Sequence, residues 1–296
     1  MKLVGLLMVF VCTWGGLLVA MGFDMPAFTK LMSAILAAVP GEFVIIMGCA
    51  FSAFIVANSM DAVKHSMKYF GALVKPASYN KDDYVELFSV LFTVFKLART
   101  KGWLALESHI ENPHESELFG QFEGFQHNHH AVVFLCDYLR IISLGCDKSF
   151  ELEALMDMEL ATIAEHEGHP GHAIQAMADG IPALGIVAAV LGVIKTMASI
   201  SEPPEVLGKL IGGALVGTFM GVWISYGMVA PIASAMTARG DTEIQYYKCM
   251  KACLIAFLNG SAPQVSVEFG RKIISHDVQP SFMELEEVLN ELPAPG

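Results

Sequence analysis

The stretch GIPALGIVAAVLGVI, residues 180–194, decides the fold class of this chain. It contains no charged side chain, carries a proline near its start, and has a small residue at nearly every helical turn. The apolar run continues to Ser199, which gives it about the 20 residues that a helix needs to cross a bilayer. We therefore interpret residues 180–199 as a membrane-spanning helix, and ask what such a helix does with no acidic group inside it.

The composition of the whole chain supports the same class. Of its 296 residues, 54% are hydrophobic and only 16% are charged, and the mean hydropathy is +0.52. These values are too apolar for an ordinary soluble domain. Further runs at 3–22, at 43–56 with its flanks and at 206–230 approach the length of a bilayer crossing. The sequence predicts an all-α integral membrane protein with four transmembrane helices and a helical cytoplasmic domain.

The basic residues predict the orientation in the membrane. Of the 18 Lys and Arg residues, nine lie between residues 59 and 178 and five follow residue 232, so 14 share one side if there are four crossings. The positive-inside rule makes that side the cytoplasm and places both termini there. The net charge of -12 argues against nucleic acid as a partner.

This topology divides the chain into four segments. Residues 1–58 form a first transmembrane hairpin with its outer connection, and residues 59–178 form a cytoplasmic helical domain. Residues 179–236 form the second transmembrane hairpin, and residues 237–296 form a cytoplasmic helical tail. The outer connection at about 23–39 is apolar enough for an amphipathic helix at the outer surface, ahead of a Pro-Gly-Glu sequence that starts the second span.

Small residues recur along the third and fourth spans at the spacing that places them on one helix face. Such ridges let helix backbones approach closely in lipid. They indicate packing within the hairpin. Because the third span has small residues on more than one face, they also indicate contact with a partner helix. The positions are Gly185, Ala188, Gly192, Gly213, Gly217 and Gly221.

Two prolines lie at about the same depth, near the cytoplasmic ends of these spans. Pro182 and Pro231 each remove a backbone hydrogen bond, and each displaces the carbonyl four residues earlier, at Ala178 and Gly227. Pro182 is either a helix start or a hinge, and Pro231 is either a helix end or a hinge.

The third and fourth spans contain no Asp, Glu or His. Thr218 is the best-placed polar group in the fourth span, although a lone threonine commonly bonds back to its own helix. The hairpin alone therefore offers no carboxylate that could hold a proton. If the protein handles ions, a partner must supply that group.

Histidine clusters suggest a metal site at first sight. In HEGHPGH, residues 166–172, the first two histidines are three apart, whereas a zinc-protease helix needs them four apart with a glutamate between. Pro170 and two glycines are expected to break the helix there. Further histidines at 127, 129 and 130 could add metal ligands only if the fold happened to bring them next to this segment. We predict no metal, no cofactor and no enzymatic activity.

Several stretches, in order, resemble the MotA family of flagellar motor stator proteins, within the MotA/TolQ/ExbB proton channel family. They are GEFVIIMGCAFSAFIVAN at 41–58, LARTKGWLALESHIENP at 97–113, FLCDYLRIISLG at 134–145, ELEALMDMELATIAEHE at 151–167 and ALVGTFMGVWISYGMVAPIAS at 214–234. The resemblance implies a homo-pentameric ring, in the bacterial inner membrane, around the helices of two copies of a MotB-like partner. That partner carries the ion-binding aspartate. Ion flow then produces torque on the flagellar rotor and so serves motility and chemotaxis.

The resemblance also assigns cytoplasmic roles. Arg99 and Glu107 match the charged pair that contacts the rotor switch protein FliG, and Glu159 matches a further acidic position. Arg99 and Glu107 are eight residues apart, so they can sit on one exposed helical surface.

In the membrane, Pro182 and Pro231 match the two prolines tied to conformational coupling. Thr218 matches the threonine near the ion path of the family. Ala189 stands where sodium-driven members typically have threonine, which implies that protons are the coupling ion.

Other functions remain open at this stage. The related ExbB and TolQ branch drives outer-membrane processes, but usually has three crossings and lacks the Arg99 to Glu107 type of motif. A membrane metalloenzyme that uses the histidine clusters is a hypothesis of a different class, and a structural scaffold without ion coupling is a third. Four crossings favour the stator.

Overall fold

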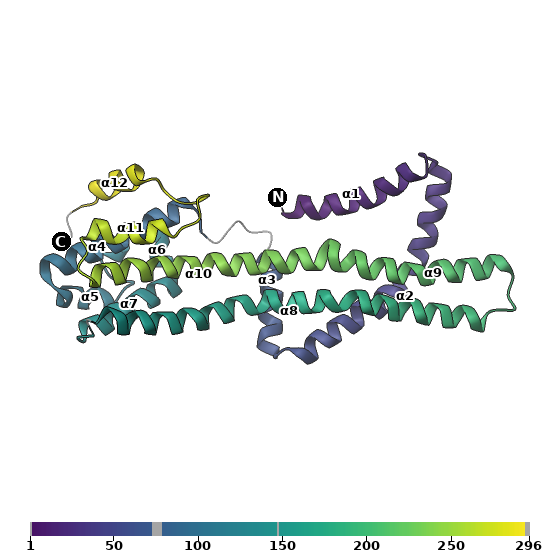
Figure 1. The fold of residues 1–296 in the computed structure, drawn as a ribbon, viewed down its shortest axis with the longest axis horizontal. Helices are drawn as coiled ribbons and strands as arrows, with labels where there is room; N and C mark the ends of the chain where they lie inside the picture. The colour runs from purple at the N-terminus through teal and green to yellow at the C-terminus, as the bar shows by residue number, and fades with distance from the viewer. Residues whose placement is uncertain (1, 73–78, 147, 294–296) are drawn as a thin grey trace. The chain divides into compact units, whose positions relative to one another are not determined.

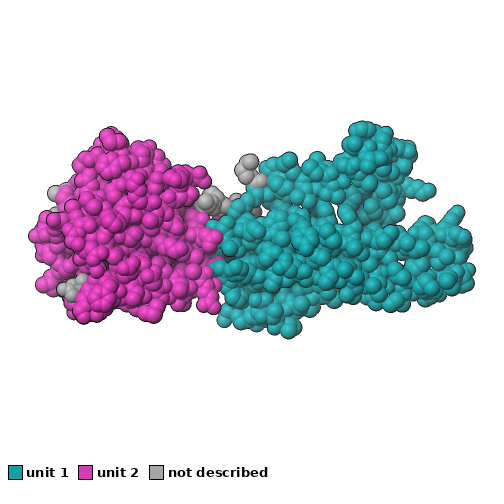
Figure 2. All heavy atoms as spheres, in the orientation of Figure 1, with its two compact units in different colours: residues 1–76, 168–238 teal, residues 77–167, 239–296 magenta. Residues whose placement is uncertain are grey.

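The computed structural model describes residues 2–72, 79–146 and 148–293. Within these ranges the chain forms helices and no strand (Figure 1), which confirms the predicted all-α class. The chain is organised as two compact units, Met1–Pro76 with Gly168–Ala238 and Ala77–Glu167 with Arg239–Gly296 (Figure 2). By contact, residues 59–76 and 168–178 of the predicted cytoplasmic domain belong to unit 1.

Unit 1 contains the membrane helices. Four helical stretches are long and apolar enough to cross a bilayer: Lys2–Ala20, Met25–Ala57, Ser149–Ala198 and Pro204–Leu258. The last stretch combines two helices joined by one π-helical turn. The elements of unit 1 are α1 (Lys2–Ala20), α2 (Met25–Ala57), α3 (Met60–Ala72), α9 (Pro204–Ile224) and η3 (Ser225–Val229), with the adjoining parts of α8 (Ser149–Ala198) and α10 (Ala230–Leu258).

Helix α2 differs from its prediction. Its N-terminus is capped by the Asp24 side chain, which accepts a hydrogen bond from the Ala27 N–H at 3.1 Å. From there one helix continues through Pro40 to Ala57, so most of the predicted outer connection is helical and continuous with the second span. The ribbon of α2 changes direction along its length (Figure 1), as expected for a helix with an internal proline.

Unit 2 is built around α4 (Lys81–Lys101), whose N-terminus carries a capping box between Asn80 and Asp83. The core of the unit is one apolar cluster to which all of its helices contribute buried side chains. The remaining elements are η1 (Trp103–Leu106), α5 (Glu107–Glu111), η2 (Phe119–Gln121), α6 (Glu123–His127), α7 (His129–Ser143), α11 (Pro263–Lys272) and α12 (Phe282–Glu291).

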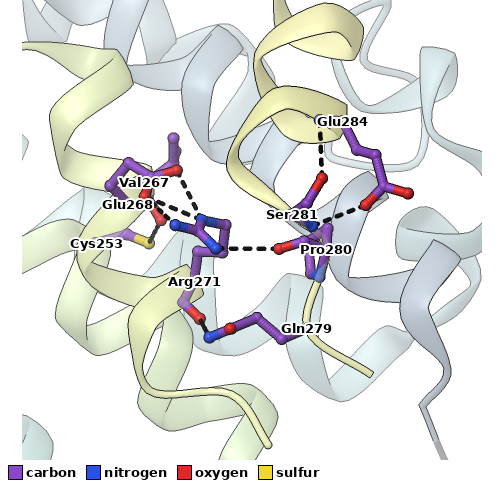
Figure 3. Close-up of polar contacts among 8 residues, drawn as sticks. All are labelled: Cys253, Val267, Glu268, Arg271, Gln279, Pro280, Ser281 and Glu284. Atoms are coloured by element: carbon purple, nitrogen blue, oxygen red, sulfur yellow. Dashed lines mark hydrogen bonds and ion pairs between the residues drawn. The ribbon is translucent and has the colours of Figure 1, made fainter. Parts of the chain in front are cut away.

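The C-terminal tail is held in unit 2 by Arg271, whose side chain is 6% exposed (Figure 3). Its guanidinium donates to both oxygens of Glu268, at 2.7 to 2.9 Å, and to the carbonyl of Pro280 at 3.1 Å. Gln279 donates back to the Arg271 carbonyl at 2.6 Å. These bonds fix the chain between α11 and the capping box of Ser281 and Glu284 that starts α12.

An exposed ion pair joins α12 to α4. The Lys81 ammonium lies 2.7 Å from the Glu284 carboxylate. The hydrogen bond from Lys81 lowers the pKa of Glu284 to about 2. Both groups face solvent, so the pair adds little to stability.

Candidate functional site

Helices α8 and α9 pack so closely that glycine is required where they cross. A Cβ at Gly221 would lie 2.9 Å from the Cα of Gly185 and 3.2 Å from the Ile181 carbonyl oxygen. A Cβ at Gly192 would lie 2.7 Å from the Cβ of Ala214. Both clashes involve backbone or a short side chain, which cannot move aside. The hairpin is therefore locked by small residues within one chain.

These contacts agree with the predicted packing within the hairpin, whereas contact of the small residues with a partner helix stays a prediction. Gly185, Gly192 and Gly221 are used inside the hairpin, and a Cβ at Gly217 would lie 3.2 Å from that of Ala188. A Cβ at Gly213 would instead lie 3.7 Å from the Cβ of Ala38 in α2. The same spacing serves packing within and between chains, so the sequence could not separate the two. The face that α8 leaves exposed carries larger apolar side chains, including Ile186, Val187, Val190 and Leu191.

We expect Gly221→Ala to disrupt this hairpin. The new methyl group would meet the Gly185 Cα and the Ile181 carbonyl, so the two helices must separate along their length. The thermal midpoint of the purified protein in detergent should fall clearly. Gly212→Ala on the same helix, where no atom lies within 4 Å of the added Cβ, is the matched control and should leave the midpoint unchanged. Equal midpoints for the two variants would contradict the close packing.

Neither proline of the hairpin interrupts its helix. Helix α8 runs from Ser149 to Ala198 through both Pro170 and Pro182. Pro182 is therefore not a helix start, and the predicted break at Pro170 does not occur. Pro231 is not a helix end either, because α10 continues past it to Leu258. The π-turn Ser225–Val229 ends two residues before Pro231, and the Ala230 N–H donates to the Ser225 carbonyl.

The two proline regions are joined by one hydrogen bond. The Ser225 hydroxyl, at the start of the π-turn, donates to the Ala178 carbonyl of α8 over 2.7 Å. Both residues are fully buried. Ala178 is the residue whose carbonyl Pro182 leaves without its usual helical donor. The sequence indicated that this carbonyl lacks a helical donor, but the rotation of one helix against the other, which brings the Ser225 hydroxyl to it, is a property of the fold.

The predicted ion-path residues lie beside the same close contact. Ala189 and Thr218 are both half-buried. A Cβ at Gly217 would lie 3.2 Å from the Ala189 backbone nitrogen, so α8 and α9 approach closely next to Thr218.

A carboxylate that the sequence reasoning missed also reaches this region. Glu42 of α2 points its Oε2 toward Gly217, where an added Cβ would lie only 2.7 Å away. That oxygen is buried and has no hydrogen-bond partner among the described residues. The third and fourth spans carry no acid of their own, but the fold supplies one from α2. The sequence contained a signal for this carboxylate, because Glu42 stands in an otherwise apolar helix.

The predicted rotor-contact pair does not share one helix. Arg99 is near the end of α4, which terminates at Lys101 because Gly102 takes a positive φ of 82°. The turn η1 then leads to Glu107, the first residue of α5. Both side chains are exposed.

Glu159 of α8 has a contact within the chain. The hydroxyl of the buried Tyr138 donates to Glu159 over 2.5 Å. Burial, together with this hydrogen bond, raises the pKa of Tyr138, so its hydroxyl stays protonated at neutral pH. Glu159 therefore helps to hold α7 against α8 in unit 2.

The histidine-rich segment at 166–172 is helical and lies within α8, which is continuous there. Across residues 2–72, 79–146 and 148–293, no group of three or more His, Cys, Asp and Glu side chains is arranged to hold a metal ion.

Comparison with known proteins places these features in a family. The family model for the motility protein A N-terminal region matches residues 3–102, and the model for the MotA/TolQ/ExbB proton channel family matches residues 128–249. Motility protein A of Salmonella typhimurium is 39% identical over 257 residues, 87% of each chain. The chain belongs to the motility protein A family. It is accordingly a flagellar stator subunit and a multi-pass protein of the inner membrane.

Other relatives agree with this placement. Motility protein A of Escherichia coli is 38% identical over 86% of this chain and 87% of its own, and the chemotaxis protein LafT of Vibrio parahaemolyticus is 31% identical over 98% of both. Among solved structures, the MotAB structure from C. jejuni matches with a TM-score of 0.72 over 93% of this chain and 96% of the other, at 20% identity. The MotAB stator complex from Bacillus subtilis matches with 0.67 over 90% and 92%, at 24% identity. These two matches show that the motility protein A fold is shared.

Proposed function

We propose that this chain assembles with a MotB-like partner into a stator unit that couples proton flow across the inner membrane to torque on the flagellar rotor. The observation that carries the proposal is the hairpin of α8 and α9, a close-packed membrane pair with no acid of its own. Pro182 lies in α8, and Pro231 lies in α10, just after the π-turn that follows α9. Such a pair can change shape, but it needs a proton-binding carboxylate from a neighbour. Solved relatives are described as MotAB complexes, which supports a partner of that kind.

We further propose a pentamer of this chain around the partner helices, with both termini in the cytoplasm. The exposed apolar side chains of α8 suit contact with a second membrane helix. We include Glu42, Ala189 and Thr218 in the ion route on this chain, beside the close contact at Gly217. An intramembrane carboxylate is costly to keep and is a functional candidate by default.

The membrane potential is sufficient to drive such a device. Moving one unit charge through 100 mV supplies about 2.3 kcal/mol. That free energy biases a two-state equilibrium roughly fiftyfold. A single proton per step can therefore set the direction of a conformational change in the hairpin.

Deletion of the gene in its host tests the proposed function. Single cells are filmed, and electron microscopy shows whether flagella are still assembled. Paralysed cells with complete flagella, rescued by the wild-type chain, would support the stator role. Normal swimming, in a strain without a second stator set, would oppose it and favour an ExbB-like or scaffolding role.

The rotor contact predicts an effect of charge. We expect Arg99→Glu or Glu107→Lys to reduce swimming speed several-fold, because each exposed charge would repel the rotor group that it now attracts. The amount of complex in the membrane should be unchanged. Lys148→Glu, which alters another exposed residue of unit 2, is the control and should swim normally. Loss of the complex from the membrane would argue for a structural role instead.

The coupling ion predicts a response to conditions. With alanine at position 189, no second hydroxyl is present beside Thr218 to help strip water from sodium. Swimming speed should therefore fall with a protonophore and stay constant when potassium replaces sodium in the medium. Speed that follows the sodium concentration would show that the proposed ion is wrong.

A further inference from the structure

The bond between Ser225 and Ala178 links two irregular points of the hairpin. On α8, Pro182 has no N–H to offer the Ala178 carbonyl. On the other helix, Ser225 opens the π-turn that precedes Pro231. The serine hydroxyl spans the 2.7 Å between them, and both residues are fully buried.

A buried carbonyl without a donor is unfavourable, and most of all in a membrane, where water cannot replace the missing bond. Ser225 supplies the donor from the facing helix. A serine in a membrane helix would ordinarily bond back to the carbonyl four residues earlier, here that of Gly221. The hydroxyl instead crosses to α8, which is possible because Gly185 and Gly221 bring the two backbones close one turn away.

The hydroxyl thus has an observed acceptor on α8, and helix geometry offers it an alternative one on its own helix. Donation to Ala178 ties the carbonyl at the Pro182 irregularity to α9 and holds the two helices in register. Donation to Gly221, on its own helix, would release that carbonyl and let α8 bend at Pro182. A hydroxyl with two alternative acceptors is a two-state element of the kind that a coupled motion requires.

We propose that Ser225 is a positioning residue that holds the Pro182 hinge in its unbent state, and that bending of α8 requires the Ser225 hydroxyl to leave the Ala178 carbonyl. The part of this inference that concerns motion rests on the proposed stator function. The hydrogen bond itself is tested by measurements on the purified protein that do not depend on motility.

A double-mutant cycle measures the bond. The full chain is purified with its partner in detergent, and thermal midpoints are compared for the wild type, Ser225→Ala, Pro182→Ala and the double variant. In the wild-type background, Ser225→Ala leaves the Ala178 carbonyl without a donor, so the midpoint falls. In the Pro182→Ala background, the new backbone N–H satisfies that carbonyl, and the shift from Ser225→Ala shrinks to less than half. Ser225→Cys, a weaker donor of similar size, replaces Ser225→Ala if the alanine variant does not assemble.

Thr196→Val is the matched control. Its hydroxyl is also buried on a membrane helix, but it bonds to the Gly192 carbonyl of its own helix. Its removal should shift the midpoint equally in both backgrounds. An equal shift from Ser225→Ala in both backgrounds would overturn the proposed bond between Ser225 and the proline irregularity.

Swimming then tests the positioning role. Ser225→Ala cells should swim at less than half the wild-type speed, with normal amounts of complex in the membrane. Coupling in the cycle together with normal swimming would overturn the role in motion. If the wild-type chain itself fails to restore swimming to the deletion strain, the proposed stator function is wrong, whereas the cycle still decides whether the bond forms as described.

Discussion

Replacing Pro182 with alanine is expected to abolish swimming while the complex remains assembled. The proline lies inside an unbroken helix of the second hairpin, where it removes the backbone donor to Ala178. Alanine restores that donor and is the best helix former, so α8 should become stiffer at this point. Packing is preserved, because the proline is only half-buried and a smaller residue fits its place. The variant should therefore lose the ability to bend at this point but keep the fold.

The measurement is the fraction of swimming cells, with the amount of the complex in the membrane measured in parallel. Pro170→Ala is the control, since it makes the same chemical change twelve residues earlier in the same helix. It should swim at near wild-type speed if bending is needed only at Pro182. Normal swimming of Pro182→Ala would remove the hinge role, and paralysis caused by loss of the complex would point to assembly instead.

The fold class was predictable because it depends on features that act along the chain. Long apolar runs, such as residues 180–199, have one stable solution in a bilayer, a helix that satisfies its own backbone. The effect of proline was predicted less well. Pro40, Pro170 and Pro182 all lie within continuous helices. At Pro182 the freed Ala178 carbonyl accepts a hydrogen bond from the Ser225 hydroxyl, one of the ways in which membrane helices accommodate an internal proline.

Features that depend on contact between helices were beyond the sequence. The spacing of Gly185, Gly217 and Gly221 indicated close packing both within the hairpin and against a partner helix, but not which glycine meets which neighbour. The approach of Glu42 to Gly217 depends on how α2 packs across α9.

Two other structural features were not predicted, although the sequence contained an indication of each. Gly102 after Lys101 is a typical helix end, which separates Arg99 from Glu107. Likewise, the carbonyl that Pro182 frees needs a donor, and Ser225 lies in the other span near Pro231. Only the rotation of the two helices, which the sequence does not contain, decides whether the hydroxyl reaches it.

The buried arginine of the tail gives the largest effect expected on stability. Arg271→Met should lower the free energy of unfolding by about 3–5 kcal/mol, because it leaves the Glu268 carboxylate, 20% exposed, without its partner. The Pro280 carbonyl loses a donor as well (Figure 3). Whole domains are stable by only about 5–15 kcal/mol. The variant is therefore expected to release α12, and the chain that leads to it, from the rest of unit 2. This release is measured as faster proteolysis after α11 and as a lower denaturation midpoint of the full chain.

Arg140→Met is the matched control. Arg140 also pairs with carboxylates, those of Glu111 and Asp137, but its side chain is 41% exposed. Exposed pairs contribute about 0–1 kcal/mol, so this variant should change the midpoint little. A second test separates the charge from the packing: in Arg271→Met with Glu268→Leu no charge is left unpaired, so much of the loss should be recovered. If Arg271→Met and Arg140→Met are equally stable, burial of the pair is not what fastens the tail.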